Sequence, residues 1–155
     1  MGDVPTLVFR SSHRFLWGRA VLYGGVLGFG GIGLALMKGS GSAVAAAILI
    51  TIGVTLLLGV LFSLTVWLMP VYVSASGVRS YNGFGVYRTL TWDEMAEVRE
   101  DGMGGLGYLV ISNRSGWREI WVPLFLADMP NVNTAVRACV DADHVLAKAL
   151  MRVGL

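Results

Sequence analysis

A stretch of 40 residues without a charged side chain constrains this chain more than any other feature. It runs from residue 39 to residue 78, and the 12 basic and 10 acidic residues of the chain all lie outside it. Charged residues make up 14% of the 155 residues, whereas soluble domains average about 25%. We therefore expect part of this chain to lie in a membrane.

Two apolar segments are long enough to be transmembrane helices. We predict the first over residues 15–37, where 18 uncharged residues follow Arg19, and the second over residues 43–69, which ends before Pro70. At about 1.5 Å per residue, each can cross a hydrocarbon core of about 30 Å. A short Gly/Ser turn joins them, which predicts an antiparallel hairpin. The alternative, two core helices of a soluble protein, is disfavoured by the length of the uncharged run.

The distribution of basic residues predicts the orientation of this hairpin. Arg10, Arg14 and Arg19 precede the first helix, whereas the loop between the helices has only Lys38. Lys and Arg near helix ends are retained on the cytoplasmic side of a membrane. Both termini are therefore predicted to be cytoplasmic, and the net charge of +2 describes no single surface. A nucleic-acid partner is not predicted.

The positions of two tryptophans support the same orientation, independently of the charged residues. Trp17 lies at the start of the first helix and Trp67 at the end of the second. Aromatic rings of this kind collect at membrane interfaces, so both are predicted at the same interface. The single cysteine, Cys139, excludes an internal disulfide and suits a reducing compartment.

Small residues recur every fourth position in the first helix. Ala20, Gly24 and Gly28 line one side, where another helix backbone can approach closely. The face is predicted to pack against the second helix, and a homodimer contact or another membrane protein stays the alternative. The apolar spans carry no charged residue, which disfavours a transporter or a channel.

After the second helix, short alternating runs separated by turn residues predict an antiparallel sheet. The predicted strands are 71–75, 78–81, 86–92, 96–100, 106–112 and 117–122. The strand-like segment 6–9 could add to an edge of this sheet, and Ser11 or Ser12 could cap the first helix. From Val132 to Ala149 the apolar period becomes helical, which predicts one amphipathic helix that caps the sheet, with a short coiled coil as the alternative.

Four segments carry a resemblance to a known family: Gly77-Val78-Arg79, residues 90–98 with Trp-Asp-Glu-x-x-x-Val, residues 108–112, and residues 120–125. Together with the preceding helical pair, they resemble bacterial membrane proteins with a pleckstrin-homology-like (PH-like) domain, including the YcxB-like group. The resemblance covers about residues 70–150 and implies a non-enzymatic module that scaffolds or recognises. Eukaryotic relatives that bind phosphoinositides use basic residues around the first hairpin. Here residues 74–77 contain none, so phosphoinositide binding is not expected.

Other motifs do not predict chemistry. G-x-G-x-x-G occurs at Gly28 and at Gly102, but neither copy leads from a strand into a helix, so no cofactor is predicted. Cys139 and His144 have no companion at metal spacing, so no metal site is predicted; Cys139 is expected in the core and His144 in solvent. The acidic residues 93, 94, 97, 100 and 101 are interpreted as a solvated face or a docking surface rather than a catalytic group.

Two tryptophans and two arginines are the candidate interaction residues. Trp117 and Trp121 share a parity along the last predicted strand, and tryptophan is enriched at binding hot spots. Burial of both rings would refute this hypothesis. Arg79 and Arg88 complete the set, because a pocket lined by them and Arg99 would favour a lipid or small-molecule ligand.

The sequence therefore predicts an α+β membrane protein in three parts: a cytoplasmic segment 1–14, a transmembrane hairpin 15–69 and a cytoplasmic PH-like domain 70–155. The location suggested by the resemblance is the bacterial inner membrane. The function predicted is a non-catalytic protein-interaction or scaffold module whose partners are the lipid bilayer and a protein or a second copy of the chain. A lipid or small-molecule sensor is the alternative.

Overall fold

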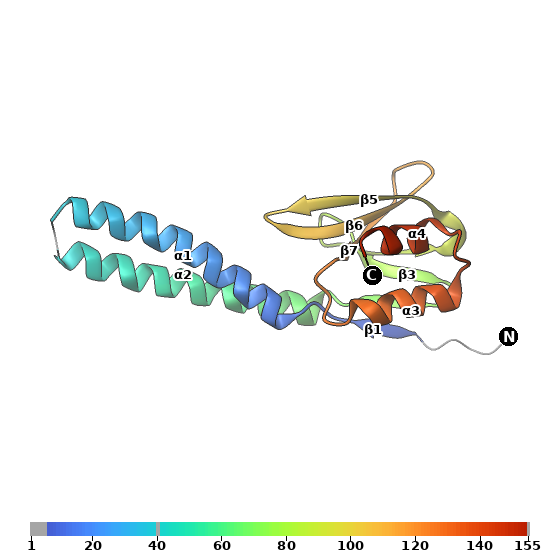
Figure 1. Ribbon diagram of the computed structural model, residues 1–155, viewed down its shortest axis with the longest axis horizontal. Helices are drawn as coiled ribbons and strands as arrows, with labels where there is room; N and C mark the ends of the chain where they lie inside the picture. The colour runs from blue at the N-terminus through green and yellow to red at the C-terminus, as the bar shows by residue number, and fades with distance from the viewer. Residues whose placement is uncertain (1–5, 40, 155) are drawn as a thin grey trace. The chain divides into compact units, whose positions relative to one another are not determined.

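The computed structural model describes residues 6–39 and 41–154, and they form two compact units (Figure 1). The helical hairpin is Ser12–Leu68, and the sheet domain combines the residues up to Ser11 with those from Met69 onward. The chain is therefore α+β, with two long apolar helices, an open antiparallel sheet and helices at the C-terminus. Of the predicted segment 1–14, the described residues 6–11 belong to the sheet domain and residues 13–14 to the first helix, while residues 1–5 lie outside the described part of the chain.

The hairpin consists of α1 (His13–Met37) and α2 (Gly41–Leu68). Each begins two residues before its predicted start. Ser12 caps α1 by accepting a hydrogen bond from the Phe15 N–H, because a hydroxyl can satisfy an amide that has no partner within the helix. Gly39, with a φ of 64°, follows the end of α1, where glycine tolerates the left-handed conformation.

The two helices pack through small residues. Ala20, Gly24 and Gly28 are all buried on α1. A Cβ atom on Gly24 would overlap the side chain of Thr55, and one on Gly28 would overlap Thr51. Both threonine hydroxyls donate to backbone carbonyls of α2, at 2.8 and 2.7 Å. The stripe of small residues therefore faces the second helix of the same chain.

Trp17 contacts the second helix at the end of the hairpin where α1 begins and α2 ends. Its Nε1 donates to Ser63 Oγ at 3.1 Å, and its ring occupies the space that a side chain on Gly59 would need. Trp67 lies one turn further along α2 and is 65% exposed. The two tryptophans thus lie near the same end of the hairpin, with different surroundings.

The sheet has seven antiparallel strands in the order β1-β2-β3-β7-β6-β5, with β4 paired to β3. Their bounds are β1 Leu7–Phe9, β2 Val71–Ser74, β3 Gly77–Tyr81, β4 Tyr87–Thr91, β5 Met95–Met103, β6 Leu106–Asn113 and β7 Glu119–Pro123. The N-terminal strand does join the sheet, because Phe9 pairs with Val71 and Leu7 with Val73. Trp92–Glu94 form a short 3-10 helix between β4 and β5.

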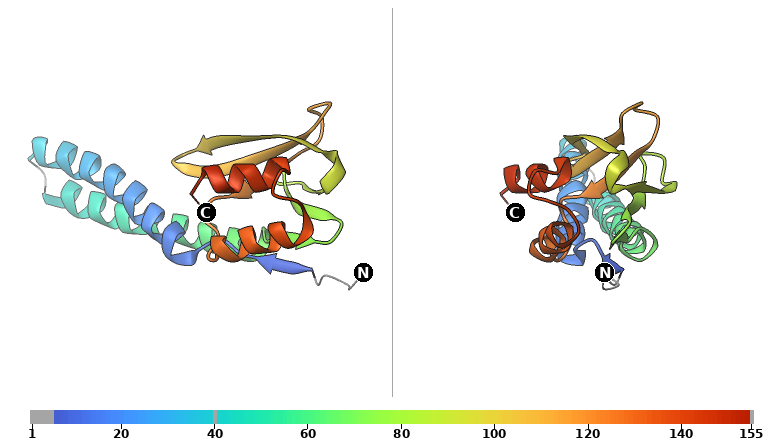
Figure 2. Two further views of the ribbon diagram at one scale, coloured as in Figure 1. Left: turned by 45° about the vertical axis from the view of Figure 1, so that its right-hand side comes forward. Right: turned by 90° about the vertical axis from the view of Figure 1, so that its right-hand side faces the viewer.

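The C-terminal region differs from the single helix expected. It forms α3 (Met129–Cys139) and α4 (Val145–Arg152), which lie on one face of the sheet (Figure 2). Val140 is extended, and the His144 side chain caps α4 by accepting from the Leu146 N–H. Ala142 is consequently exposed in the break. The helical spacing of apolar residues continues through the break between α3 and α4. Asp141 and Asp143 lie in this break, and aspartate favours turns over helix interiors.

The sheet has two different faces. An aliphatic core lies between one face of the sheet and the helices α3 and α4. The sheet contributes Leu109, Ile111 and Ile120, and the helices contribute Val132 and Leu150. The opposite face carries rings in edge-on or tilted contact, Tyr72, Tyr81, Tyr87, Tyr108, Trp121 and Phe125. Burial raises the pKa of Tyr81 above its usual range and that of Tyr87 to about 12.

Candidate functional site

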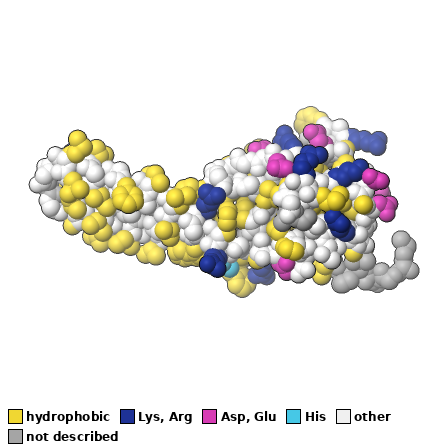
Figure 3. Space-filling view, in the orientation of Figure 1, with side chains coloured by type: hydrophobic (Ala, Val, Ile, Leu, Met, Phe, Trp, Pro, Cys, Tyr) yellow, Lys and Arg dark blue, Asp and Glu magenta, His cyan; other side chains and the backbone are white. Residues whose placement is uncertain are grey.

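A hollow of about 440 Å³ lies between the β3–β4 loop and the β6–β7 turn. We call it the Phe84–Trp117 hollow; its lining residues are Asn82, Phe84, Arg88, Ser115, Gly116, Trp117 and Glu119. Phe84 is 91% exposed and Trp117 is 86% exposed, the two most exposed aromatic side chains of the sheet domain. Figure 3 shows charged side chains scattered over the visible face of this domain. Two rings left in solvent there need an explanation.

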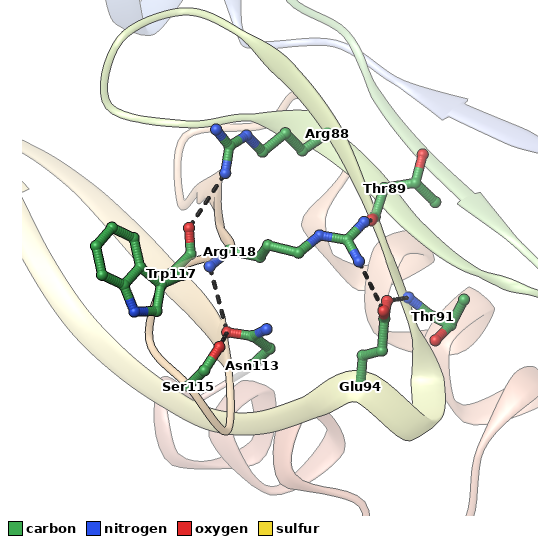
Figure 4. A network of polar contacts seen from close by, with 8 residues as sticks. All are labelled: Arg88, Thr89, Thr91, Glu94, Asn113, Ser115, Trp117 and Arg118. Carbon is green, nitrogen blue, oxygen red and sulfur yellow. Dashed lines mark hydrogen bonds and ion pairs between the residues drawn. The ribbon is translucent and has the colours of Figure 1, made fainter.

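The turn that carries Trp117 is fixed by hydrogen bonds. Asn113 Oδ1 accepts from the Arg118 N–H at 3.2 Å and from Ser115 Oγ at 3.1 Å (Figure 4). The Gly116 N–H donates to the Asn113 carbonyl at 2.9 Å, and Gly116 has a φ of 71°. Trp117 is therefore displayed from a well-connected turn, which lowers the entropy lost when its ring binds a partner.

Two arginines connect this turn to β4. Arg88 Nη1 donates to the Trp117 carbonyl at 3.2 Å. Arg118 Nη1 donates to Glu94 Oε1 at 2.7 Å, and its Nη2 donates to the Thr89 carbonyl at 3.1 Å (Figure 4). Side chains thus link β4 and the 3-10 helix to the residues just before β7.

Glu94 is the acidic member of this network. The Thr91 N–H donates to Glu94 Oε2 at 3.1 Å, and this bond, more than the nearby Arg118, holds the pKa of Glu94 below its usual range. The carboxylate is therefore ionised at neutral pH and caps the 3-10 helix while it pairs with the arginine. Its role is structural, since it points into the network rather than into the hollow.

The β3–β4 loop is closed around one buried side chain. Asn82 is 6% exposed, and its Oδ1 accepts from the Phe84 and Val86 N–H groups, both at 3.0 Å. The Gly85 N–H donates to the Asn82 carbonyl at 2.9 Å, with a φ of 76° at Gly85. Phe84 and Val86 are consequently exposed on a loop whose amides already have acceptors.

The structure brings together two of the four candidate interaction residues, Trp117 and Arg88. Trp117 precedes β7, so it does not share a strand face with Trp121 as its parity suggested. Trp121 is half-buried, packs on Tyr108 at 5.3 Å between ring centroids, and donates from Nε1 to Glu119 at 3.1 Å. One exposed ring, not a pair, therefore remains from that hypothesis.

Arg79 and Arg88 do not form one site. Arg79 pairs across the ladder with Thr89, and Arg88 with Ser80, so the arginines lie on opposite faces of the sheet. The Arg79 guanidinium stacks near Tyr72 and Tyr87, 5.9 and 5.5 Å from their ring centroids. Arg99 forms an ion pair with Glu119 at 3.6 Å. The arginines do not converge on one ligand as a shared pocket would require.

Sequence reasoning missed Phe84 as a candidate. Its signal is the segment Asn-Gly-Phe-Gly, which lies between the predicted strands 78–81 and 86–92. A large aromatic residue between two glycines has little to pack against in a tight turn, so its exposure was foreseeable. Glu119 was also missed, because its position at the hollow depends on the pairing of β7 with β3 and β6.

A second hollow, of about 720 Å³, contains Trp92, Cys139 and His144. His144 is half-buried rather than solvated, because its ring packs edge-on to Trp92 at 5.7 Å. Its Nδ1 accepts from the Leu146 N–H, so Nε2 is the donor to the Trp92 carbonyl at 3.1 Å. Burial raises the pKa of the Cys139 thiol. Both imidazole nitrogens are engaged, and nothing here activates a nucleophile.

The acidic side chains do not gather into a metal site in the residues that the structure describes. No group of three or more His, Cys, Asp and Glu residues within 6–39 and 41–154 is arranged to hold a metal ion. Asp143, beside the second hollow, pairs with Lys148 at 2.9 Å, and this lysine lowers the pKa of the carboxyl group. Local pairing accounts for this carboxylate.

The predicted membrane-interface residues lie around the start of α1 and the end of α2. Arg14 and Trp17 are exposed, and the Arg19 guanidinium lies 5.2 Å from the centroid of the Phe15 ring. Arg10 accepts a hydrogen bond at its carbonyl from the Ala127 N–H, within the sheet domain. Both helices are long and apolar enough to cross a membrane.

Comparisons with known proteins identify no family. No family model, no curated protein and no solved structure matches this chain. The resemblance to PH-like membrane proteins therefore stays a prediction, and the function has to be argued from the residues and their arrangement.

Proposed function

We propose that this chain is a membrane-tethered PH-like module that binds a protein at the cytoplasmic surface of the bacterial inner membrane and has no catalytic activity. The hairpin is the tether, and the Phe84–Trp117 hollow is the binding site. The exposed Trp117 ring, carried by a hydrogen-bonded turn beside Arg88, is the observation on which the proposal rests.

The residue distribution of the hairpin supports the tether. Large apolar side chains face outward, such as Phe29 at 83% exposure and Leu49 at 70%, while the buried positions of α1 are mostly glycine and alanine. Figure 3 shows hydrophobic side chains along the hairpin. In water, such a surface would drive aggregation, whereas in lipid it lies in its matching solvent and small residues let the helices approach.

The pairing of β1 with β2 supports a hairpin that crosses the membrane twice. β1 precedes α1 and β2 follows α2, yet Phe9 and Val71 are neighbours in one ladder. The segments that flank the hairpin must therefore lie on the same side of any membrane that it crosses. Arg10, Arg14 and Arg19 favour the cytoplasmic side.

Seven antiparallel strands with helices on one face are compatible with a PH-like domain. The chain departs from the expected pattern in two places: β1 adds a strand from before the hairpin, and the C-terminal helix is split into α3 and α4. PH-like modules recognise rather than catalyse, so the proposal assigns no reaction to this chain.

The chemistry of the hollow favours a protein partner. Tryptophan and arginine are among the residues most enriched at binding hot spots, and Trp117 and Arg88 both line the hollow. A lipid or small-molecule sensor, the alternative function, is less supported because Arg79 stacks on tyrosines and Arg99 pairs with Glu119.

Site-specific photocrosslinking in native membranes tests this proposal. A photoreactive amino acid replaces Ser115, which lines the hollow, and a matched copy carries it at Met103, which is 59% exposed on the β5–β6 hairpin. We expect a discrete protein adduct from position 115 that Trp117→Ala abolishes, and no such adduct from position 103. Identical adducts from both positions, or adducts that survive Trp117→Ala, would refute the site. Recovery of a lipid in place of a protein would support the sensor.

A further inference from the structure

The β3–β4 loop, whose Phe84 lines one side of the Phe84–Trp117 hollow, also exposes the apolar Val86 side chain. Phe84 is 91% and Val86 53% exposed, and both lie on the same five-residue loop. From Met69 to Trp92 the chain has two arginines, Arg79 and Arg88, and no aspartate or glutamate. This segment is therefore apolar and basic, in a domain that otherwise carries both signs of charge.

The loop lies beside the residues that immediately follow α2. The Tyr87 hydroxyl donates to the Pro70 carbonyl at 2.8 Å, and a Cβ atom on Gly85 would lie 3.5 Å from the Met69 side chain. Pro70 is only two residues after Leu68, the last residue of α2. Since consecutive Cα atoms are about 3.8 Å apart, the loop lies within a short distance of the point where the chain leaves the helix.

The hydrogen bonds of the loop also suit a lipid environment. A backbone N–H without an acceptor is costly in a region with little water. The N–H groups of Phe84 and Val86 are both bound by the Asn82 side chain, and that of Gly85 by the Asn82 carbonyl. The tip of the loop can therefore enter the headgroup region without leaving these three donors unsatisfied.

We infer that this loop is a membrane contact, in which Phe84 and Val86 insert into the lipid interface of the membrane that the hairpin crosses. The inference rests on the proposed membrane tether but not on the proposed protein partner. Arg79 and Arg88, on opposite faces of the two strands that carry the loop, give this segment a positive charge that suits anionic headgroups. The contact adds a third attachment to the two chain connections.

Lipid quenching of a fluorescent label tests the contact in the full chain. In a Cys139→Ser background, Phe84→Cys and Val86→Cys each receive an environment-sensitive label, and the chain is reconstituted in vesicles of phosphatidylethanolamine and phosphatidylglycerol. Spin-labelled lipid is the quencher. The matched control is Ser76→Cys, an exposed turn residue at the other end of β3. The positive control is Leu57→Cys in α2, at 59% exposure.

We expect labels at 84 and 86 to be blue-shifted and quenched by the lipid, less than at Leu57→Cys but clearly more than at Ser76→Cys. Quenching at 84 and 86 no greater than at 76, with Leu57→Cys quenched, overturns the contact and leaves the tether intact. A blue shift at 84 without lipid quenching also overturns it, because a protein surface then covers the loop. Absence of quenching at Leu57→Cys refutes the tether itself, and the inference with it.

Discussion

The hairpin and the sheet domain bury opposite kinds of residues. In the hairpin, Gly24 and Gly28 are buried and Phe29 is 83% exposed; in the sheet domain, Leu109 and Ile120 are fully buried and the charged residues face outward. The sheet domain is arranged as a domain in water is, and the hairpin as the proposed tether in lipid would be. The comparison teaches that the composition of the whole chain describes neither unit. The chain as a whole is basic and apolar, but the hairpin has an apolar surface and the sheet domain has an apolar core under a polar surface.

The largest expected effect is on the core of the sheet domain. Ile120→Ala removes a fully buried side chain and should lower the free energy of unfolding by about 2–5 kcal/mol, through lost burial and the cavity left behind. The measurement is near-UV circular dichroism of the purified chain in detergent during denaturation.

The control for that substitution is Leu57→Ala, a similar truncation at a residue of the hairpin that is 59% exposed. It should change the free energy of unfolding by less than about 0.5 kcal/mol. Equal losses at the two positions would contradict the inside-out description of the hairpin.

The next effect concerns the helix contact. Gly24→Leu places a side chain where Thr55 lies and should destabilise the hairpin by about 1–3 kcal/mol, because the helices must separate. Gly25→Leu is the matched control, since a Cβ atom there meets nothing within 4 Å.

A disulfide reports this separation. Cysteines at Gly31 and Ala47 suit a bond, because a Cβ on Gly31 would lie 3.9 Å from the Ala47 Cβ. Oxidation should link them in the starting chain and with Gly25→Leu, and much less with Gly24→Leu. Equal yields in all three would mean that the small-residue face does not hold the helices together.

A smaller effect is expected at the cap of α4. His144→Ala removes the acceptor of the Leu146 N–H and should cost about 1 kcal/mol of stability, as lost N-caps do. His144→Asn, which keeps an acceptor, should recover most of this loss in thermal unfolding. If alanine and asparagine behave alike, the packing on Trp92, and not the cap, is what His144 contributes.

The smallest effect is a pH dependence of the link between β4 and the β6–β7 turn. The pKa of Glu94 is lowered in the folded state, chiefly by the Thr91 N–H, so its contribution is present above the unfolded pKa of glutamate, about 4.3. It is lost as the pH falls through the lower folded value. We expect Glu94→Gln to flatten the acid limb of a stability curve, with Glu97→Gln, an exposed residue of β5, as the control. An unchanged acid limb would exclude this role.

Local patterns predicted the elements of this fold well. The uncharged residues 20–37 and 39–78 predict the two helices, and period-two alternation predicts most strands, because each pattern depends on residues close in the chain. The break between α3 and α4 was missed, since the apolar spacing from Val132 to Leu150 runs on in phase while the chain turns at Val140. Only the turn preferences of Asp141 and Asp143 signalled it.

The candidate site was less predictable, because it depends on pairing across the chain. Trp117 and Arg88 were both singled out, but their contact joins residues 29 apart in sequence. The Arg118–Glu94 pair, 24 residues apart, had no local signal. Arg79 and Arg88 lie on opposite faces because of the register between β3 and β4. The alternation of apolar and polar residues within each strand would have indicated this.

The pairing of β1 with β2 also imposes an order on synthesis. β1 leaves the ribosome first, but its partner Val71–Ser74 is made only after the complete hairpin. Until then, the apolar Leu7 and Val8 have no ladder to join. Topologically, the hairpin is an insertion in the connection between two adjacent antiparallel strands, a connection that a few residues can make. Replacing residues 12–68 by a short turn should therefore produce the sheet domain without the membrane-insertion step that the proposed tether needs.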